Sequence, residues 1–217
     1  MIIYLEDADA EVVLIPRIYA SLKRINWTNT NSGAEITVQP EVDHWAIRWK
    51  GATPRDAAIA LEFDMQPKLE GEIGPVEQLG DGRISLHAYQ ATTHGEKLRY
   101  EPQPHKNTVG YWVNAEDFAT WKIQVEQPGK FNVGILQGCG PGQGGSVASL
   151  TIDREDHTID ELGFTVEETG HFQNFIWRTV GVVEILKPGL YTLKLQPKRI
   201  EKAALMDIRQ MQLVRLP

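Results

Sequence analysis

The chain is predicted to be all-β, and three features of its sequence indicate this. Between Ala119 and Val125, apolar side chains alternate with polar ones, which is the two-residue period of a strand with one buried and one wet face. The segment Gln127–Lys130 then turns the chain, and the alternation resumes from Phe131, as is typical of a hairpin. Few windows place apolar residues three and four positions apart, so helices are not expected.

Short alternating runs bounded by Gly, Pro, Asn and Asp divide the chain into two β-regions. In the first region, residues 1–66, we expect strands at Val12–Ile15, Leu22–Trp27, Glu35–Val38, Trp45–Trp49 and Ala57–Phe63. In the second region, residues 83–217, we expect strands at Ile84–Tyr89, Leu98–Tyr100, Ala119–Val125, Phe131–Leu136, Ser146–Ile152, Ile176–Ile185, Tyr191–Leu195 and Asp207–Val214. Residues 67–82 contain glycines and prolines without alternation and are predicted to link the regions.

The charge and the hydropathy of the chain argue against some classes of binding partner. The 217 residues carry a formal net charge of -7, and no basic cluster extends beyond Lys198-Arg199, which argues against binding to nucleic acid. No apolar run is long enough to span a membrane, and the first residues lack the pattern of a secretory signal. The chain is therefore expected to be cytoplasmic or a piece of a longer exported protein. The single cysteine, Cys139, excludes an internal disulfide.

The segment Gln137–Ser146 is rich in glycine, but it does not have the context of a phosphate site. Phosphate loops precede a helix, whereas the strand-like run Val147–Ile152 follows here. We therefore expect a loop between strands. Cys139, inside this segment, has no neighbouring base in the sequence and is expected to be inert rather than nucleophilic.

Acids and histidines give few signals of chemistry. The pairs Glu116-Asp117 and Glu167-Glu168 lie in turn-like segments, where solvated charge is the expected role. The spacings of His87, His94 and His105 match no zinc site. Asp207 differs, because it is an acid inside an apolar strand and needs a cation or hydrogen-bond donors as its partner. Calcium, which is bound by oxygen ligands, is the metal to consider there.

Two groups of aromatic residues lie in loops or at the starts of strands, next to amides. They are Tyr111-Trp112 and the segment His171–Phe175. Rings outside a core, with amides beside them, suit the apolar face and the hydroxyl rim of a sugar. The alternative is that one ring of each group fills an end of the sandwich. The candidate ligand-binding residues are Tyr111, Trp112, Asn114, Phe172, Gln173 and Asn174.

Most of the second region, from about Leu86 to Val214, resembles a galactose-binding-like β-sandwich of the kind found as carbohydrate-binding modules. The segments that carry the resemblance are Gly110–Trp121, Gln127–Phe131, Thr169–Phe175, Leu186–Leu193 and Ala204–Ile208. The first region resembles the β-domain that follows the catalytic barrel of retaining α-L-fucosidases, through Val13–Pro16, Ala34–Val38 and Thr53–Asp64. The resemblance implies a small antiparallel β-domain followed by a jelly-roll sandwich, without the barrel that would hold the catalytic residues.

The resemblance also assigns roles to single residues. In such modules the sugar is held between two aromatic rings, at positions that correspond to Tyr111 or Trp112 and to Phe172. The module pattern has an Asn two residues before the acid of the last strand, where this chain has Leu205. The structural calcium of these modules uses an acid in the first strand and one in the last. Asp207 matches the last, but the first-strand segment His87–Gln90 has no acid.

Three hypotheses for function follow. The first is a non-catalytic carbohydrate-binding accessory region of a fucosidase-like glycoside hydrolase, with a glycan and a catalytic domain of the same polypeptide as partners. Such a hydrolase would place it outside the cell or in the periplasm. The second is a purely structural module that braces a catalytic barrel or mediates oligomerisation. The third, a hydrolase in its own right, predicts turnover that we do not expect.

Overall fold

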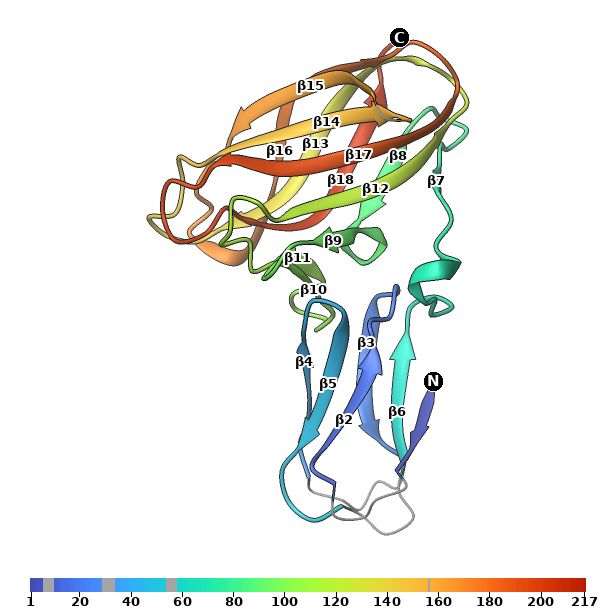
Figure 1. Cartoon of the computed structure of the whole chain (residues 1–217), viewed down its shortest axis with the longest axis vertical. Helices are drawn as coiled ribbons and strands as arrows, with labels where there is room; N and C mark the ends of the chain where they lie inside the picture. The colour runs from blue at the N-terminus through green and yellow to red at the C-terminus, as the bar shows by residue number, and fades with distance from the viewer. Residues whose placement is uncertain (6–9, 29–33, 54–57, 156) are drawn as a thin grey trace.

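A computed structural model describes residues 1–5, 10–28, 34–53, 58–155 and 157–217. In the described part of the first region, two narrow three-stranded sheets lie face to face (Figure 1). All of their strand pairs are antiparallel. One sheet has the order β1 (Ile2–Tyr4), β6 (Ala58–Phe63) and β3 (Leu22–Trp27), and the other has β2 (Val12–Pro16), β5 (His44–Trp49) and β4 (Ile36–Pro40).

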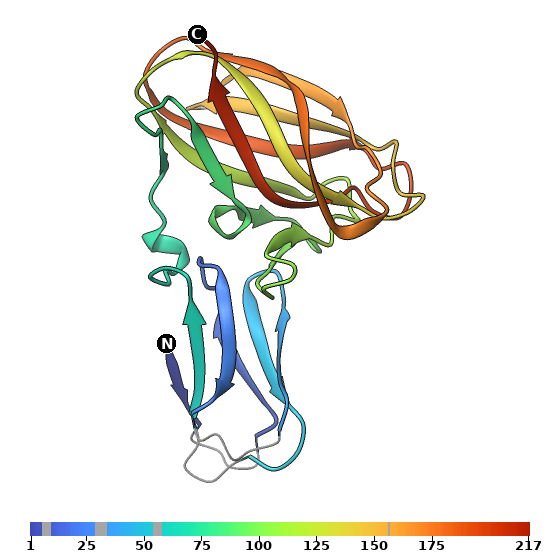
Figure 2. The ribbon, with the colours of Figure 1, turned by 180° about the vertical axis from the view of Figure 1, so that it is seen from behind.

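The second region is a two-layer sandwich of larger sheets, seen from opposite sides in Figures 1 and 2. The first layer has the order β10 (Arg99–Glu101), β11 (Thr108–Gly110), β18 (Asp207–Arg215), β13 (Gly129–Cys139) and β16 (His171–Ile185), and β8 (Ile84–His87) also pairs with β18. The second layer has the order β15 (His157–Thr165), β14 (Val147–Arg154), β17 (Gly189–Arg199), β12 (Phe118–Val125) and β7 (Val76–Glu77), and β9 (Thr92–His94) also pairs with β12. Two single turns of 3-10 helix, η1 (Glu70–Glu72) and η2 (Ala88–Gln90), precede β7 and β9.

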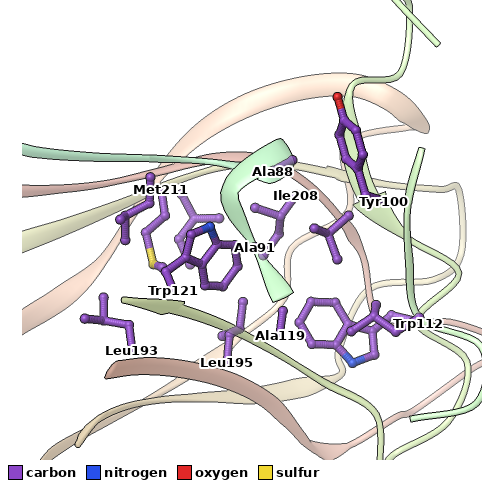
Figure 3. Packing of buried hydrophobic residues seen from close by; sticks show 14 of the residues in the cluster. Ala88, Ala91, Tyr100, Trp112, Ala119, Trp121, Leu193, Leu195, Ile208 and Met211 are labelled. Atoms are coloured by element: carbon purple, nitrogen blue, oxygen red, sulfur yellow. The ribbon is translucent and has the colours of Figure 1, made fainter. Parts of the chain in front are cut away.

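The alternation that predicts the sandwich also builds its core. Ala119, Trp121, Ile123 and Val125 of β12 are all buried, and Trp121 lies opposite Leu193 of the neighbouring β17. Figure 3 shows Trp121 in the space between the layers, close to Met211 and Ala91. Burial of a large apolar side chain contributes about 1.5–3 kcal/mol, so this face holds the layers together.

All of the expected strands are present, with shifted ends, although Ala57 lies outside the described residues. Five further strands were not expected. Of these, β1, β7, β9 and β11 have three residues or fewer, which is too short to show a period. The fifth, β15, is an edge strand exposed on both faces for much of its length, so its sequence lacks alternation. The segment expected to link the regions contains β7, which pairs with β12.

Two expected loops are in part strand. The glycine-rich segment Gln137–Ser146 begins inside β13, and only the residues after Cys139 form a loop. The segment His171–Phe175 is the start of β16, where the pairing with β13 is irregular between Gln137 and Cys139. Backbone pairing therefore continues further towards this end of the sandwich than the sequence indicates.

The two regions share a junction built around buried polar contacts. Arg17 is 5% exposed and donates to the carbonyl oxygen of Ala91 at 2.6 Å and to Oγ1 of Thr93 at 3.1 Å. Its guanidinium lies 5.5 Å from the ring centre of Tyr100, and the Tyr100 ring in turn packs 6.3 Å from that of Trp45. Trp45 and Tyr100 belong to a single cluster of buried residues that spans both regions.

Candidate functional site

The loop that follows β11 turns its two neighbouring aromatic rings in opposite directions. The ring of Tyr111 is 49% exposed, and its backbone has the left-handed φ of 60°. Trp112 is 1% exposed, and its Nε1 donates to the carbonyl oxygen of Asp117 at 2.9 Å. Figure 3 shows the Trp112 ring among the core residues, near Ala119. The expectation that Trp112 contacts a ligand is therefore wrong, and the alternative, a ring that fills an end of the sandwich, applies to it.

Asn114 shapes the same loop. Its Oδ1 accepts the backbone N–H of Glu116 at 3.1 Å, and its backbone carbonyl accepts the N–H of Asp117 at 3.2 Å. The side chain is partly exposed, because it stands at the turn between β11 and β12. Its side-chain oxygen is thus engaged within the loop, and Nδ2 is the group of this side chain that can donate to a ligand.

Asp117 is buried, so the expectation of solvated charge is wrong for this acid. Its carboxylate accepts three backbone N–H groups, from Glu96 and Lys97 at 2.9 Å and from Leu98 at 2.8 Å. A Cβ added at Gly95 would lie 2.0 Å from Oδ1, so only glycine fits there. The carboxylate fastens the segment 95–98 to the end of the Tyr111 loop.

Phe172 lies at the other side of the candidate site, at the start of β16. A Cβ added at Gly140 would lie 2.6 Å from Cε2 of its ring, so the partly buried ring rests directly on the glycine loop. The Nδ2 of Asn174 donates to the carbonyl oxygen of Thr169 at 2.5 Å. The backbone N–H of Gln173 donates to Nδ1 of His171 at 3.1 Å. The glycine-rich segment thus provides the flat support for an aromatic ring.

The start of β18 connects the two loops. Gly138 of β13 is paired with Asp207, and Val109 of β11 is paired with Ile208. A Cβ added at Gly110 would lie 2.8 Å from Oδ1 of Asp207. Tyr111 and Phe172 therefore lie at the same end of this sheet, with the start of β18 and the end of β13 between them. Leu205, which precedes β18, is buried, and its N–H donates to the carbonyl oxygen of Trp112 at 2.8 Å.

Asp207 belongs to a buried cluster of charges with Glu101 and Lys106. Asp207 and Glu101 are 7% and 3% exposed, and Nζ of Lys106 donates to Oε1 of Glu101. Burial, together with the charge of Glu101 and against that of Lys106, raises the pKa of Asp207 to about 8. Glu101 and Lys106 were not identified from the sequence, because only the pairing of β10, β11 and β18 brings them to Asp207.

The residues of this cluster do not complete a calcium site. Among the described residues, no three His, Cys, Asp or Glu side chains come together as metal ligands. Calcium takes six to eight oxygen ligands, but here an ammonium group already occupies Glu101. The segment His87–Gln90, which lacks an acid, instead stacks the rings of His87 and Tyr89 at 5.2 Å. Calcium at Asp207 remains a prediction from the resemblance.

Cys139 is fully buried, and burial raises the pKa of its thiol to about 11. A thiol so far from ionisation is a poor nucleophile, in line with the inert role expected for it.

Arg154, Ile159 and Leu186 line a hollow of about 390 Å³ at the end of the sandwich that is remote from Tyr111. Two hollows of about 330 and 250 Å³ lie beside η1. None of these three hollows is lined by a candidate site residue. No helix of the described chain could span a membrane.

No protein-family model and no curated protein matches the chain. Among solved structures it is similar to an alpha-L-fucosidase from Vibrio sp. strain EJY3, with 12% identity, a TM-score of 0.41, and coverage of 100% of this chain and 38% of that one. It is also similar to a family 35 carbohydrate binding module from Clostridium thermocellum, with 12% identity, a TM-score of 0.45, and coverage of 62% and 98%. It is also similar to the insecticidal crystal protein Cry2Aa, with 11% identity, a TM-score of 0.51, and coverage of 75% of this chain and 27% of that one. The likeness to Cry2Aa concerns the fold alone, and the chain spans under half the length of the fucosidase.

Proposed function

We propose that the second region binds a carbohydrate at the loop surface formed by Tyr111 and Phe172, as an accessory part of a fucosidase-like glycoside hydrolase. The observation that carries the proposal is the ring of Tyr111, which is 49% exposed on a left-handed backbone. That conformation costs about 1–2 kcal/mol for a residue with a side chain. Strained residues gather at ligand sites, where the surroundings hold them in place.

The chemistry of the surface suits a sugar. Exposed aromatic rings stack on the apolar face of a pyranose, and amides bond to its hydroxyl groups. Because Leu205 is buried and apolar, the hydrogen bonds must come from other residues, and the partly exposed Asn114 and Gln173 are the proposed donors. The sugar-binding neighbours of known structure and the resemblance of the sequence support the same conclusion.

Isothermal titration calorimetry tests the proposal with L-fucose, D-galactose and the β-1,4-linked hexasaccharides of xylose and mannose. Loss of a stacking ring is expected to weaken binding about tenfold in Tyr111→Ala and in Phe172→Ala. Tyr4→Ala is the matched control, because Tyr4 is 79% exposed on β1, far along the chain from the site. Absence of binding to every probe, or equal loss in Tyr4→Ala, would refute the proposal.

A second candidate function is structural, and a specific surface favours it. Ile2 and Tyr4 of β1 are 54% and 79% exposed, and Leu14 of β2 is 62% exposed. Both are edge strands of their sheets, where exposed apolar side chains favour contact with another surface. Such a surface would pack against another domain or another copy. Sedimentation equilibrium tests the second possibility, and self-association that is lost in the double variant Tyr4→Ser/Leu14→Ser would support it.

For the third hypothesis, hydrolysis by this chain itself, we expect no turnover of aryl fucosides or aryl galactosides. Glu101 and Asp207 are adjacent carboxyl groups, but both are buried beneath Gly110. A pair of catalytic acids must face a cleft that admits the substrate. Measurable release of nitrophenol from these substrates would overturn this expectation.

A further inference from the structure

The contacts of Arg99 join the first region to the exposed ring of the candidate site. Arg99 lies in β10, and its side chain is 12% exposed. Its Nη1 donates to the carbonyl oxygen of Pro40 at 2.9 Å and to Oε2 of Glu41 at 2.6 Å, both in the first region. Its Nε donates to the carbonyl oxygen of Lys97 at 3.0 Å. The guanidinium is therefore held from three sides.

The same guanidinium lies against Tyr111. Its central carbon is 4.4 Å from the centre of the Tyr111 ring, and Nζ of Lys106 is 5.9 Å from that centre. Arg99 is also paired across the sheet with Gly110, the residue before Tyr111. A cation at this distance attracts the face of the ring, so Arg99 holds the Tyr111 ring in place while the residue stays 49% exposed to a ligand.

The backbone of Tyr111 makes such support necessary. Its φ of 60° is unfavourable for a tyrosine, and a ring half exposed to water has few apolar neighbours to retain it. Retention by a cation that is itself anchored restricts the ring to one orientation. A preordered ring loses less conformational freedom on binding, which increases affinity.

We propose that the first region positions Tyr111 for ligand binding through Glu41 and Arg99, so that the glycan affinity of the second region depends on its neighbour. This inference rests on the proposed carbohydrate binding. Arg99 and Glu41 are positioning residues and have no contact with the sugar. The small β-domain is then part of the binding unit, and its β4–β5 turn supports the recognition loop, which is the segment 111–117 between β11 and β12.

The test uses the whole chain with Glu41→Lys, which places a positive charge against Arg99, and with Glu41→Gln, which removes only the charge. The matched control is Glu62→Lys. Glu62 also lies in the first region and pairs with an arginine, Arg24, at 2.6 Å, but this pair is exposed on β3 and β6. We expect about a tenfold loss of affinity for the best probe of the calorimetric panel in Glu41→Lys, a smaller loss in Glu41→Gln, and none in Glu62→Lys.

A second readout does not need a ligand. In protein labelled with 3-fluorotyrosine, the ¹⁹F resonance of Tyr111 is identified as the one missing from Tyr111→Phe. Glu41→Lys is expected to shift and broaden this resonance, and Glu62→Lys is expected to leave it unchanged. An unshifted resonance in Glu41→Lys overturns the inference whether or not a glycan binds. A shifted resonance in a protein that binds none of the probes supports the positioning and instead refutes the proposed function.

Discussion

Replacing Asp117 by alanine tests how the recognition loop is fastened to the sandwich. The buried carboxylate accepts three backbone N–H groups at 2.8–2.9 Å, from Glu96, Lys97 and Leu98. A hydrogen bond to a charged group contributes about 1.5–3 kcal/mol, and burial of the ion costs several kcal/mol. The balance of these terms gives a loss of about 3–5 kcal/mol in the free energy of unfolding for Asp117→Ala.

Urea unfolding followed by tryptophan fluorescence measures this loss. At a slope of about 2 kcal/mol per molar urea, the midpoint should fall by roughly 1.5–2.5 M. Glu116→Ala is the control, because Glu116 is the exposed acid next in the chain and its removal should change stability by under about 0.5 kcal/mol. A loss below about 1 kcal/mol in Asp117→Ala would refute the reasoning that the three bonds fasten the loop.

The contact between Gly95 and Asp117 can be tested in a second way. In Gly95→Ala the new Cβ would lie 2.0 Å from Oδ1 of Asp117, in addition to the strain of a φ of 112°. When Asp117 is already alanine, the clash with the carboxylate is gone, and the strain and the 3.0 Å contact with Cα of residue 117 remain. The double variant should therefore be more stable than the sum of the single losses predicts, by at least about 1 kcal/mol, and additive losses would show that the close contact is not there.

Three further predictions follow from the buried polar groups and the glycine loop. Burial, with the charge of Glu101, raises the pKa of Asp207 from 3.8 to about 8, so the folded state holds this proton more tightly than the unfolded chain does. The free energy of unfolding should therefore fall as pH rises between about 4 and 8, by up to about 1.4 kcal/mol per unit, and Asp207→Asn should flatten that slope in urea titrations. If the same titrations in millimolar calcium raise the stability of the wild type but not of Asp207→Asn, the calcium prediction is supported; equal curves with calcium and with EDTA count against it. Tyr100→Phe removes a buried hydroxyl donor and should lower the free energy of unfolding by about 1 kcal/mol. A thermal midpoint equal to that of the wild type would contradict this. Gly140→Ala should displace the ring of Phe172 and lower glycan affinity in calorimetry, while unchanged affinity would remove Phe172 from the site.

The sheets could be predicted because a strand with one buried face has apolar side chains at every second position of its sequence. In β12, Trp121 and its alternate neighbours face the core, and each was assigned to the buried side from the pattern alone. β15 was missed for the same physical reason, since a strand with two wet faces has no apolar alternation. Whole strands were therefore missed only where burial is weak or the strand is short, as in β15 and β1.

The candidate site was harder to predict. Two aromatic side chains in a row do not reveal which one is buried, and the left-handed φ of 60° at Tyr111 means that the alternation of an extended strand does not apply there. Glu101 and Lys106 reach Asp207 only through the pairing of separate strands. Asp117 looks like any acid in a turn until its three N–H donors are known. Each of these facts depends on long-range register, which local sequence does not contain.

The cluster of buried residues that spans both regions affects how the protein unfolds. Trp45 of the first region and Tyr100 of the second pack their rings together, and Arg17 is buried between the two parts. Cutting the chain between the regions would open this apolar surface and leave a buried cation without its acceptors. The chain should therefore unfold in one calorimetric transition. The two β-regions, which are separate in the sequence, would then unfold as one cooperative unit.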